Sequence, residues 1–101
     1  MAERMDLESR LIDIMKTNHV YYQPPETIKM KYPAIVYFLD DINHLYANDS
    51  KYKEDRSYTI TLIDRNPESI YIDDILALPY CSFDRHFVTD NLNHFIFNIF
   101  W

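Results

Sequence analysis

The sequence predicts a single α+β domain over residues 1–101: a small antiparallel or mixed sheet of about four strands, two helices on one face, and a projecting β-hairpin arm. Three observations predict this. The chain has 101 residues, which suits one compact domain. Its hydrophobic share of 48% and aromatic share of 16% exclude a disordered chain. Apolar spacing alternates between helical and strand periods in the order α-β-β-α-β-β.

The first helix is predicted over residues 3–17. Its apolar positions follow the i, i+4, i+7, i+8 spacing that makes one hydrophobic helix face, and they are Leu7, Leu11, Ile14 and Met15. After "QPPE", whose paired prolines exclude a helix, residues 34–43 and 57–64 are rich in β-branched and aromatic side chains. These two segments are predicted as a strand pair.

Both faces of this strand pair are predicted to be apolar. A reversal at Asn48, Asp49 and Ser50 would place Val36 and Phe38 on one face, together with Ile60 and Leu62. Ile35 and Tyr37 would then line the other face. Because two helices cover only one side of a small sheet, we expect the second face to meet another protein chain, through Val36 and Phe38 or through Ile35 and Tyr37.

The stretch "HLYANDSKYKEDRSY", residues 44–58, lies between the two strands and is polar and charged. We predict that it forms a ribbon that projects beyond the body of the protein. Tyrosines are typical interface anchors, so Tyr46 and Tyr52 are the candidate contacts, with Asn48 and Asp49 at the tip of the ribbon. The other interpretation is a solvated hydrophilic loop.

A short second helix is predicted before Pro79. It begins either with Asn66 as its cap or later, near Ile72. The chain then ends in a hairpin made of "YCSFDRHFVT" and "NHFIFNIFW". A connection of odd length is favoured over a two-residue turn at Asp90 and Asn91, because the odd length collects the aromatic side chains of both strands on one face.

Composition excludes several classes of function. The chain has no glycine, which phosphate-cradling loops and dinucleotide fingerprints require. A net charge of −6 argues against general binding to the nucleic-acid backbone. Cys81 is the single cysteine, so there is no internal disulfide, and it is predicted to be a buried strand residue. The start "MAERMDLESR" lacks an apolar signal run and no stretch is long enough to span a membrane, so we expect synthesis in the cytoplasm.

An enzymatic interpretation depends on the last hairpin. Asp84, His86 and His94 are expected on its solvent side, where two histidines can hold a metal ion or exchange protons. Alternation alone often produces such a group, so solvent-facing histidines are the preferred interpretation. We predict no catalytic, cofactor-binding or metal-binding residues.

The most specific sequence motifs are "QPP", "YPAIVY", "YAND", "TLID" followed by "NPES", and "SFDRHF" followed by "DNLNH". From about residue 20 to the end, these motifs resemble the small tail terminator, or tail completion, proteins of long-tailed bacteriophages. The resemblance implies an α+β subunit that forms a ring, usually of six copies. That ring caps the tail tube at its head-proximal end and joins it to the head.

The resemblance also implies a set of partners. These are other copies of the chain, the tail tube protein and the head–tail connector or stopper protein, with DNA passing through the channel without specific binding. It implies no cofactor, no enzymatic activity and no membrane, and a location in the tail or neck of the virion. The alternatives are a head-completion or connector protein of the same neck, or a small metal-dependent nuclease or hydrolase using Asp84, His86 and His94.

Overall fold

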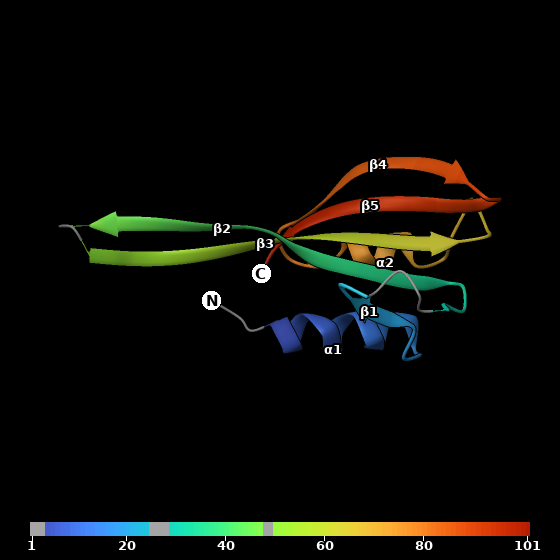
Figure 1. The fold of residues 1–101 in the computed structure, drawn as a ribbon, viewed down its shortest axis with the longest axis horizontal. Coiled ribbons are helices and arrows are strands. Elements are labelled where there is room, and N and C mark those ends of the chain that lie inside the picture. Colours follow the sequence, from blue (N-terminus) through green and yellow to red (C-terminus); the bar gives the residue numbers. More distant parts are fainter. Residues whose placement is uncertain (1–3, 25–28, 48–49) are drawn as a thin grey trace.

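The computed structural model describes residues 4–24, 29–47 and 50–101, and within residues 43–47 and 50–55 it describes the backbone alone. In these ranges the chain forms two helices and five strands, in the order α1-β1-β2-β3-α2-β4-β5 (Figure 1). The five strands form one mixed sheet with the order β1-β2-β3-β5-β4. The α+β class is therefore confirmed, and the sheet has one strand more than predicted.

The extra strand is β1, a short segment beside β2. The elements span Arg4–Met15 (α1), Val20–Tyr22 (β1), Ala34–Ala47 (β2), Ser50–Asp64 (β3), Ile72–Leu76 (α2), Cys81–Thr89 (β4) and Leu92–Phe100 (β5). β1 pairs in parallel with β2, and the other neighbouring strands are antiparallel. Three residues are too short a run for alternation to identify a strand, so the sequence did not predict β1.

The hydrophobic core lies between one face of the sheet and the two helices. Leu7, Leu11 and Met15 of α1 are buried there, as the helical spacing predicted. Ile75 of α2 joins the same cluster, so both helices lie on one face of the sheet. The strands contribute Ile35, Tyr37, Tyr58, Ile60, Leu62, Phe95, Phe97 and Ile99.

The second helix begins late, at Ile72, which confirms the second of the two predicted starts. The segment before it is made of turns in which side chains accept hydrogen bonds from the backbone. Asp64 Oδ1 accepts from the N–H of Asn66 at 3.1 Å, and Asn66 Oδ1 accepts from the N–H of Glu68 at 2.9 Å. Asn66 therefore stabilises a turn and does not cap the helix.

The connection of the last hairpin differs from the prediction. Asp90 and Asn91 form a two-residue turn with φ of 52° and 62°, and Phe87 lies opposite His94. The predicted odd-length loop is therefore wrong. The realignment of the aromatic residues occurs instead at a register shift between Phe83 and Arg85, which leaves Asp84 as an extra residue. Beyond this bulge Phe83 lies opposite Phe97, on the core face.

The first strand pair also contains a bulge that the sequence did not predict. Asp40 is an extra residue of β2, between Leu39 and Asp41. As a result Tyr37 lies opposite Ile60 and Val36 opposite Thr61, whereas the predicted register placed Val36 on the same face as Ile60. The prediction of which residues share a face was therefore wrong by one residue in the body of the sheet.

The projecting hairpin arm is formed by the ends of β2 and β3 (Figure 1). β5 ends opposite Ser57, and beyond this point the pairing of β2 with β3 continues from Ile42 and Arg56 to Ala47 and Ser50. We refer to residues 42–47 and 50–56 as the arm. The arm elongates the molecule, whose principal extents are 52 × 27 × 24 Å.

Candidate oligomerisation surface

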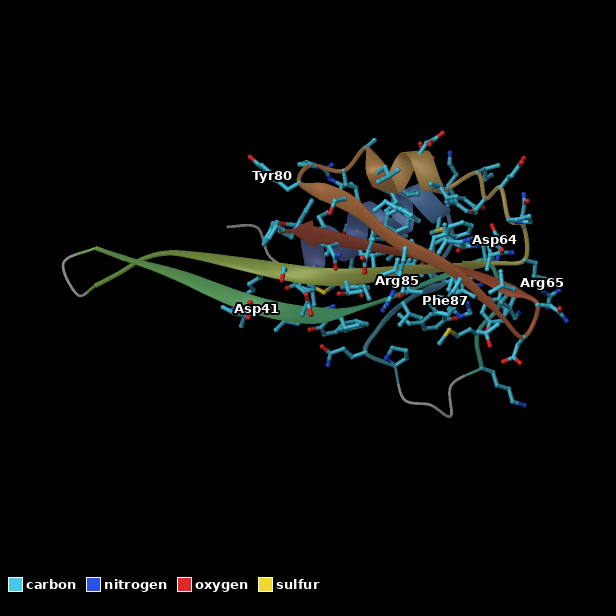
Figure 2. All side chains as sticks on the ribbon, turned by 90° about the horizontal axis from the view of Figure 1, so that it is seen from above. Asp41, Asp64, Arg65, Tyr80, Arg85 and Phe87 are labelled. Atoms are coloured by element: carbon cyan, nitrogen blue, oxygen red, sulfur yellow. The ribbon has the colours of Figure 1, made fainter. Side chains whose placement is uncertain are left out.

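One face of the sheet is not covered by helices, and we call it the open face. Strand register places three rows of residues on it across β2, β3, β5 and β4. The rows are Ala34, Ile63, His94 and Phe87; Val36, Thr61, Ile96 and Arg85; and Phe38, Thr59, Asn98 and Ser82. Figure 2 shows Phe87 and Arg85 along β4 in this part of the molecule.

The open face combines a buried centre with exposed aromatic residues at its borders. Ile63 and Ile96 retain only 8% of their accessible surface. By contrast, Phe38 is 41% exposed and Phe87 is 42% exposed. The ring of Phe87 stacks on His94, with centroids 4.7 Å apart. Half-exposed aromatic side chains around a packed centre are typical of a surface that contacts another protein.

The two sets of predicted interface residues on β2 lie on opposite faces of the sheet. Val36 and Phe38 lie on the open face, whereas Ile35 and Tyr37 are fully buried beneath the helices. Tyr37 is therefore a core residue of this chain, and its inclusion in the interface is corrected. The bulge at Asp40 shifts the register, so Ile35 and Tyr37, and not Val36 and Phe38, share a face with Ile60 and Leu62.

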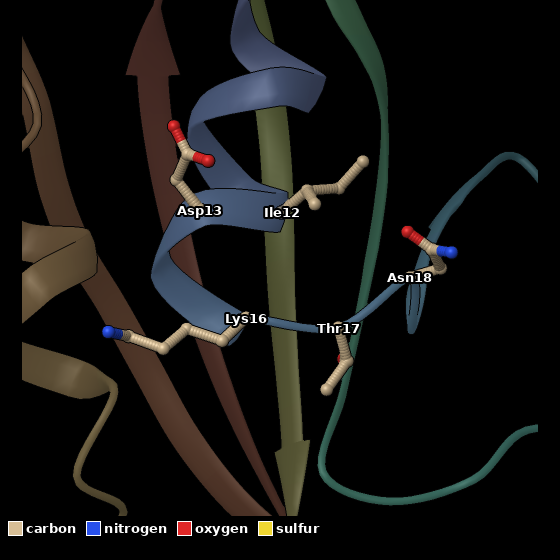
Figure 3. A pocket seen from close by; sticks show the side chains of 5 residues that line it. All are labelled: Ile12, Asp13, Lys16, Thr17 and Asn18. Atoms are coloured by element: carbon tan, nitrogen blue, oxygen red, sulfur yellow. The ribbon is translucent and has the colours of Figure 1, made fainter.

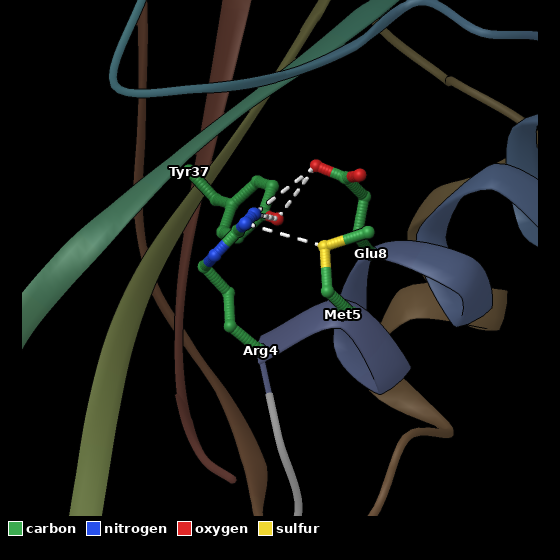
Figure 4. Close-up of polar contacts among 4 residues, drawn as sticks. All are labelled: Arg4, Met5, Glu8 and Tyr37. Atoms are coloured by element: carbon green, nitrogen blue, oxygen red, sulfur yellow. Dashed lines mark hydrogen bonds and ion pairs between the residues drawn. The ribbon is translucent and has the colours of Figure 1, made fainter.

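Tyr37 belongs to a polar network that joins α1 to the sheet (Figure 4). Its hydroxyl accepts a hydrogen bond from Arg4 Nη1 at 2.9 Å and donates one to Glu8 Oε1 at 2.9 Å. The Arg4 guanidinium also lies 4.2 Å from the ring centroid of Tyr22. Burial, together with the hydrogen bond to Glu8, raises the pKa of Tyr37, so its hydroxyl remains protonated.

The arm carries the remaining predicted contacts. Asn48 and Asp49 lie outside the described residues. The backbone of Tyr46 pairs with Lys51, and the register shift at this point leaves Tyr52 as the extra residue of β3. The backbone of His44 lies opposite that of Glu54. Ser50 was predicted to be part of the turn. It is paired with Ala47 and therefore belongs to β3.

The residues of the enzymatic alternative are not brought together. His86 stacks on Phe95 of the core face, with centroids 4.6 Å apart, whereas His94 lies on the open face beside Phe87. The prediction that both histidines share the solvent side of the hairpin is therefore wrong. Asp84 is the bulge residue between the two registers. In the described ranges no three His, Cys, Asp or Glu side chains are placed to hold a metal ion.

His86 has a structural partner. Its Nε2 lies 3.0 Å from Asn93 Oδ1, and Asn93 Nδ2 donates to the carbonyl oxygen of Arg65 at 3.2 Å. This arrangement makes the amide oxygen the acceptor, so Nε2 of His86 carries the proton. Asn93 is buried and connects β4 to the segment that follows β3, which gives the "DNLNH" motif a role in folding.

Neither Cys81 nor the pocket at the end of α1 has the chemistry of a reactive or ligand-binding site. Cys81 is half-buried, and burial raises the pKa of its thiol to about 11, which disfavours the reactive thiolate. A pocket of about 560 Å³ lies at the end of α1, lined by Ile12, Asp13, Lys16, Thr17 and Asn18 (Figure 3). Its two charged side chains are exposed, so it is a surface depression to which we assign no ligand.

Sequence reasoning missed Phe87 and Phe100 as exposed aromatic residues. Phe87 was expected on the same face as the core aromatics Phe95 and Phe97, whereas no position was predicted for Phe100; they are 42% and 51% exposed. Phe100 lies opposite Ser57, at the base of the arm. The position of Phe87 on the open face follows from the two-residue turn, and that of Phe100 follows from strand alternation beside the buried Ile99.

Neither helix in the described part of the chain has the length and apolar character needed to cross a lipid bilayer. In comparisons with known proteins, no family model and no curated protein sequence matches this chain.

Proposed function

We propose that this protein is a structural assembly protein that forms a homo-oligomeric ring, with the function of a phage tail terminator. In this proposal the ring, of about six copies by resemblance, caps the tail tube at its head-proximal end and joins it to the neck connector. The ring is a component of the virion and binds no cofactor. DNA passes through its channel without specific contacts.

The projecting arm is the observation that carries the proposal. Six residue pairs extend beyond the last residue of β5, which corresponds to about 20 Å at ~3.3 Å per residue. An isolated two-stranded ribbon is marginally stable in water. An arm of this length is therefore expected to be stabilised by contact with another protein, which an assembly protein provides.

The open face supports the same function. It offers Phe38 near the base of the arm and Phe87 on the outer strand as exposed aromatic contacts. A head-completion or connector protein of the neck would use such surfaces equally, and it remains the alternative. The nuclease alternative loses its geometric basis, because His86 and His94 lie on opposite faces of the sheet.

Electron microscopy of the purified protein, alone and mixed with tail tubes, tests the proposal. We expect rings of uniform diameter, either free or on one end of each tube. A second readout is tube length, because tubes assembled with the protein should stop growing at that end. A protein that forms no ring on tubes and leaves tube growth unchanged would contradict the proposal.

The double variant Tyr46→Ala, Tyr52→Ala tests the contribution of the arm. The described core is built under the helices and does not use the arm, so the variant should retain its circular dichroism spectrum. Loss of an interface tyrosine that is a binding hot spot costs about 2 kcal/mol or more, so capping should be lost. The matched control is Tyr46→Phe, Tyr52→Phe, which keeps both rings and should still cap. If the alanine variant caps tubes normally, the arm is a solvated segment and does not anchor the assembly.

A further inference from the structure

The outer edge of β4 is the second unusual feature of the sheet. β4 is the last strand in the order β1-β2-β3-β5-β4, and β5 is its one strand partner among the described residues. All of its residues from Ser82 to Thr89 are exposed. A long exposed edge strand presents unpaired backbone donors and acceptors to which another strand can bind.

The two-residue turn determines which backbone groups face outward. Thr89 and Leu92 flank the turn, so they exchange both hydrogen bonds across the hairpin. In an antiparallel pair this bonding alternates, so the N–H and C=O groups of Phe87 point towards His94. The backbone N–H and C=O groups of His86 and Val88 therefore point outward from the edge of the sheet, away from β5.

The bulge at Asp84 limits the edge that another strand can use. Bulges and charged residues are the usual means by which proteins block an edge strand, and both occur at Asp84 and Arg85. The remainder, His86–Thr89, contains no Lys, Arg, Asp or Glu and includes Val88, which is 59% exposed. This short segment is therefore unprotected.

The arm, like the outer edge of β4, extends past the strands that would cover its edges. Its two strands are paired with each other, β5 ends at Phe100, and beyond it the Trp101 N–H donates to the carbonyl oxygen of Arg56 at 2.9 Å, so the edge of β3 that no described strand covers begins past Arg56. β1 covers β2 only from Ile35 to Tyr37, so both outer edges of the arm extend beyond the neighbouring strands. Three strands are needed for a sheet of independent stability, and the arm supplies two. A strand edge from another molecule would complete it.

We propose that the outer edge of β4, at His86–Thr89, pairs with the arm of a second copy of this chain. This inference rests on the proposed ring and identifies its subunit contact. The contact joins two different surfaces, so it is head-to-tail, and repeated contacts of this kind close a ring when the rotation between copies allows it. The sheet of each copy then continues through the arm of the next.

Val88→Pro is the direct test. Proline removes the N–H of residue 88, which faces outward, and leaves the hydrogen bonds between β4 and β5 in place. The variant should keep the circular dichroism spectrum and thermal midpoint of the wild type but lose ring formation on tail tubes, measured by co-sedimentation and microscopy. The matched control is Val88→Ala, which shortens the side chain but keeps the N–H, and it should still assemble.

A mixing experiment identifies the partner surface. Ile42 and Arg56 lie opposite each other, so an Asn-Gly turn can join them in place of residues 43–55. This arm-shortened chain keeps its β4 edge, whereas Val88→Pro keeps its arm. We expect each variant alone to be monomeric by native mass spectrometry and the mixture to give a 1:1 heterodimer, because one complete contact remains.

The outcomes separate this inference from the proposed function. Rings formed by Val88→Pro would overturn the β4 contact while leaving the tail terminator function intact. The arm-shortened chain could instead form dimers that disappear when the substitution Val88→Pro is added to it. Such dimers would indicate that β4 pairs with itself, and they would also overturn the inference. A wild-type protein that forms no ring on tubes contradicts both proposals. A heterodimer in the mixture, with neither variant assembling alone, supports the contact between β4 and the arm.

Discussion

Tyr37 shows how one residue connects the helices to the sheet. Its ring is fully buried and lies 4.9 Å from the ring of Tyr22, measured between centroids. Its hydroxyl lies between a cation and a carboxylate, accepting from Arg4 and donating to Glu8. Burial without these partners would cost free energy, so the network compensates for the desolvation of the hydroxyl. Tyr37 therefore acts in folding, although its sequence position suggested a contact residue.

Tyr37→Phe is predicted to lower the free energy of unfolding by about 1–2 kcal/mol at pH 8, because both hydrogen bonds are lost while Arg4 and Glu8 remain. The pKa of Tyr37 is raised above 10.0 in the folded state. Its contribution to stability is therefore full below about pH 10 and is lost as the pH rises through the folded pKa.

Urea unfolding between pH 8 and pH 11 measures both effects. The difference in unfolding free energy between wild type and Tyr37→Phe should shrink towards the alkaline end. Tyr80→Phe is the control, because the Tyr80 side chain is 81% exposed and should change stability little. A constant difference across this pH range would show that the hydroxyl of Tyr37 does not titrate with unfolding.

At the scale of elements, the absence of glycine determines how the chain turns. Among the residues that the structure describes, five non-glycine residues adopt positive φ, and they are Lys16, Gln23, Tyr80, Asp90 and Asn91. Asp and Asn tolerate this region, which suits the turn between β4 and β5. Lys16 follows the last residue of α1, where helices usually end in glycine, and its N–H donates to the carbonyl oxygen of Ile12 at 2.7 Å. Its φ of 57° is therefore strained.

Lys16→Gly is predicted to raise the free energy of unfolding by about 1 kcal/mol, because glycine adopts positive φ without a steric clash at Cβ. Thermal and urea unfolding would measure the gain. Lys16→Ala is the matched control, since it removes the same charge and keeps Cβ, so it should give no comparable gain. Equal stability of the two variants would mean that the strain at this position is small.

The elements also show how far sequence alone can reach. Periodicity gave the type of both helices and of four strands, because burial on one side imposes a repeat on each of them. It did not give the register. Asp40 and Asp84 each insert one residue into a strand, and a bulge of this kind reverses which side chains face the core. Val36 and Phe38 could therefore be predicted for the open face only as one of two alternatives.

For the whole molecule, the two proposed contacts use different parts of the sheet. The arm and the edge of β4 extend the sheet from copy to copy, whereas the open face is perpendicular to that direction and remains free for a further contact. Phe38 lies on this face, two residues before the bulge residue Asp40 and four residues before Ile42, where the arm begins. An exposed aromatic residue in this position is suited to be buried only when the assembly forms.

Phe38→Lys tests this assignment. Phe38 is 41% exposed and lies outside the core cluster, so the variant is predicted to unfold within about 1 kcal/mol of the wild type in urea. A charge buried without a partner opposes association, so the variant should no longer cap tail tubes. Phe38→Tyr keeps the aromatic ring and should cap normally.

If Phe38→Lys still forms oligomeric rings by sedimentation yet fails on tubes, the open face contacts the tube protein. If the oligomeric rings are lost as well, the open face contacts neighbouring copies. Normal capping would instead leave the open face in solvent and confine assembly to the arm and β4.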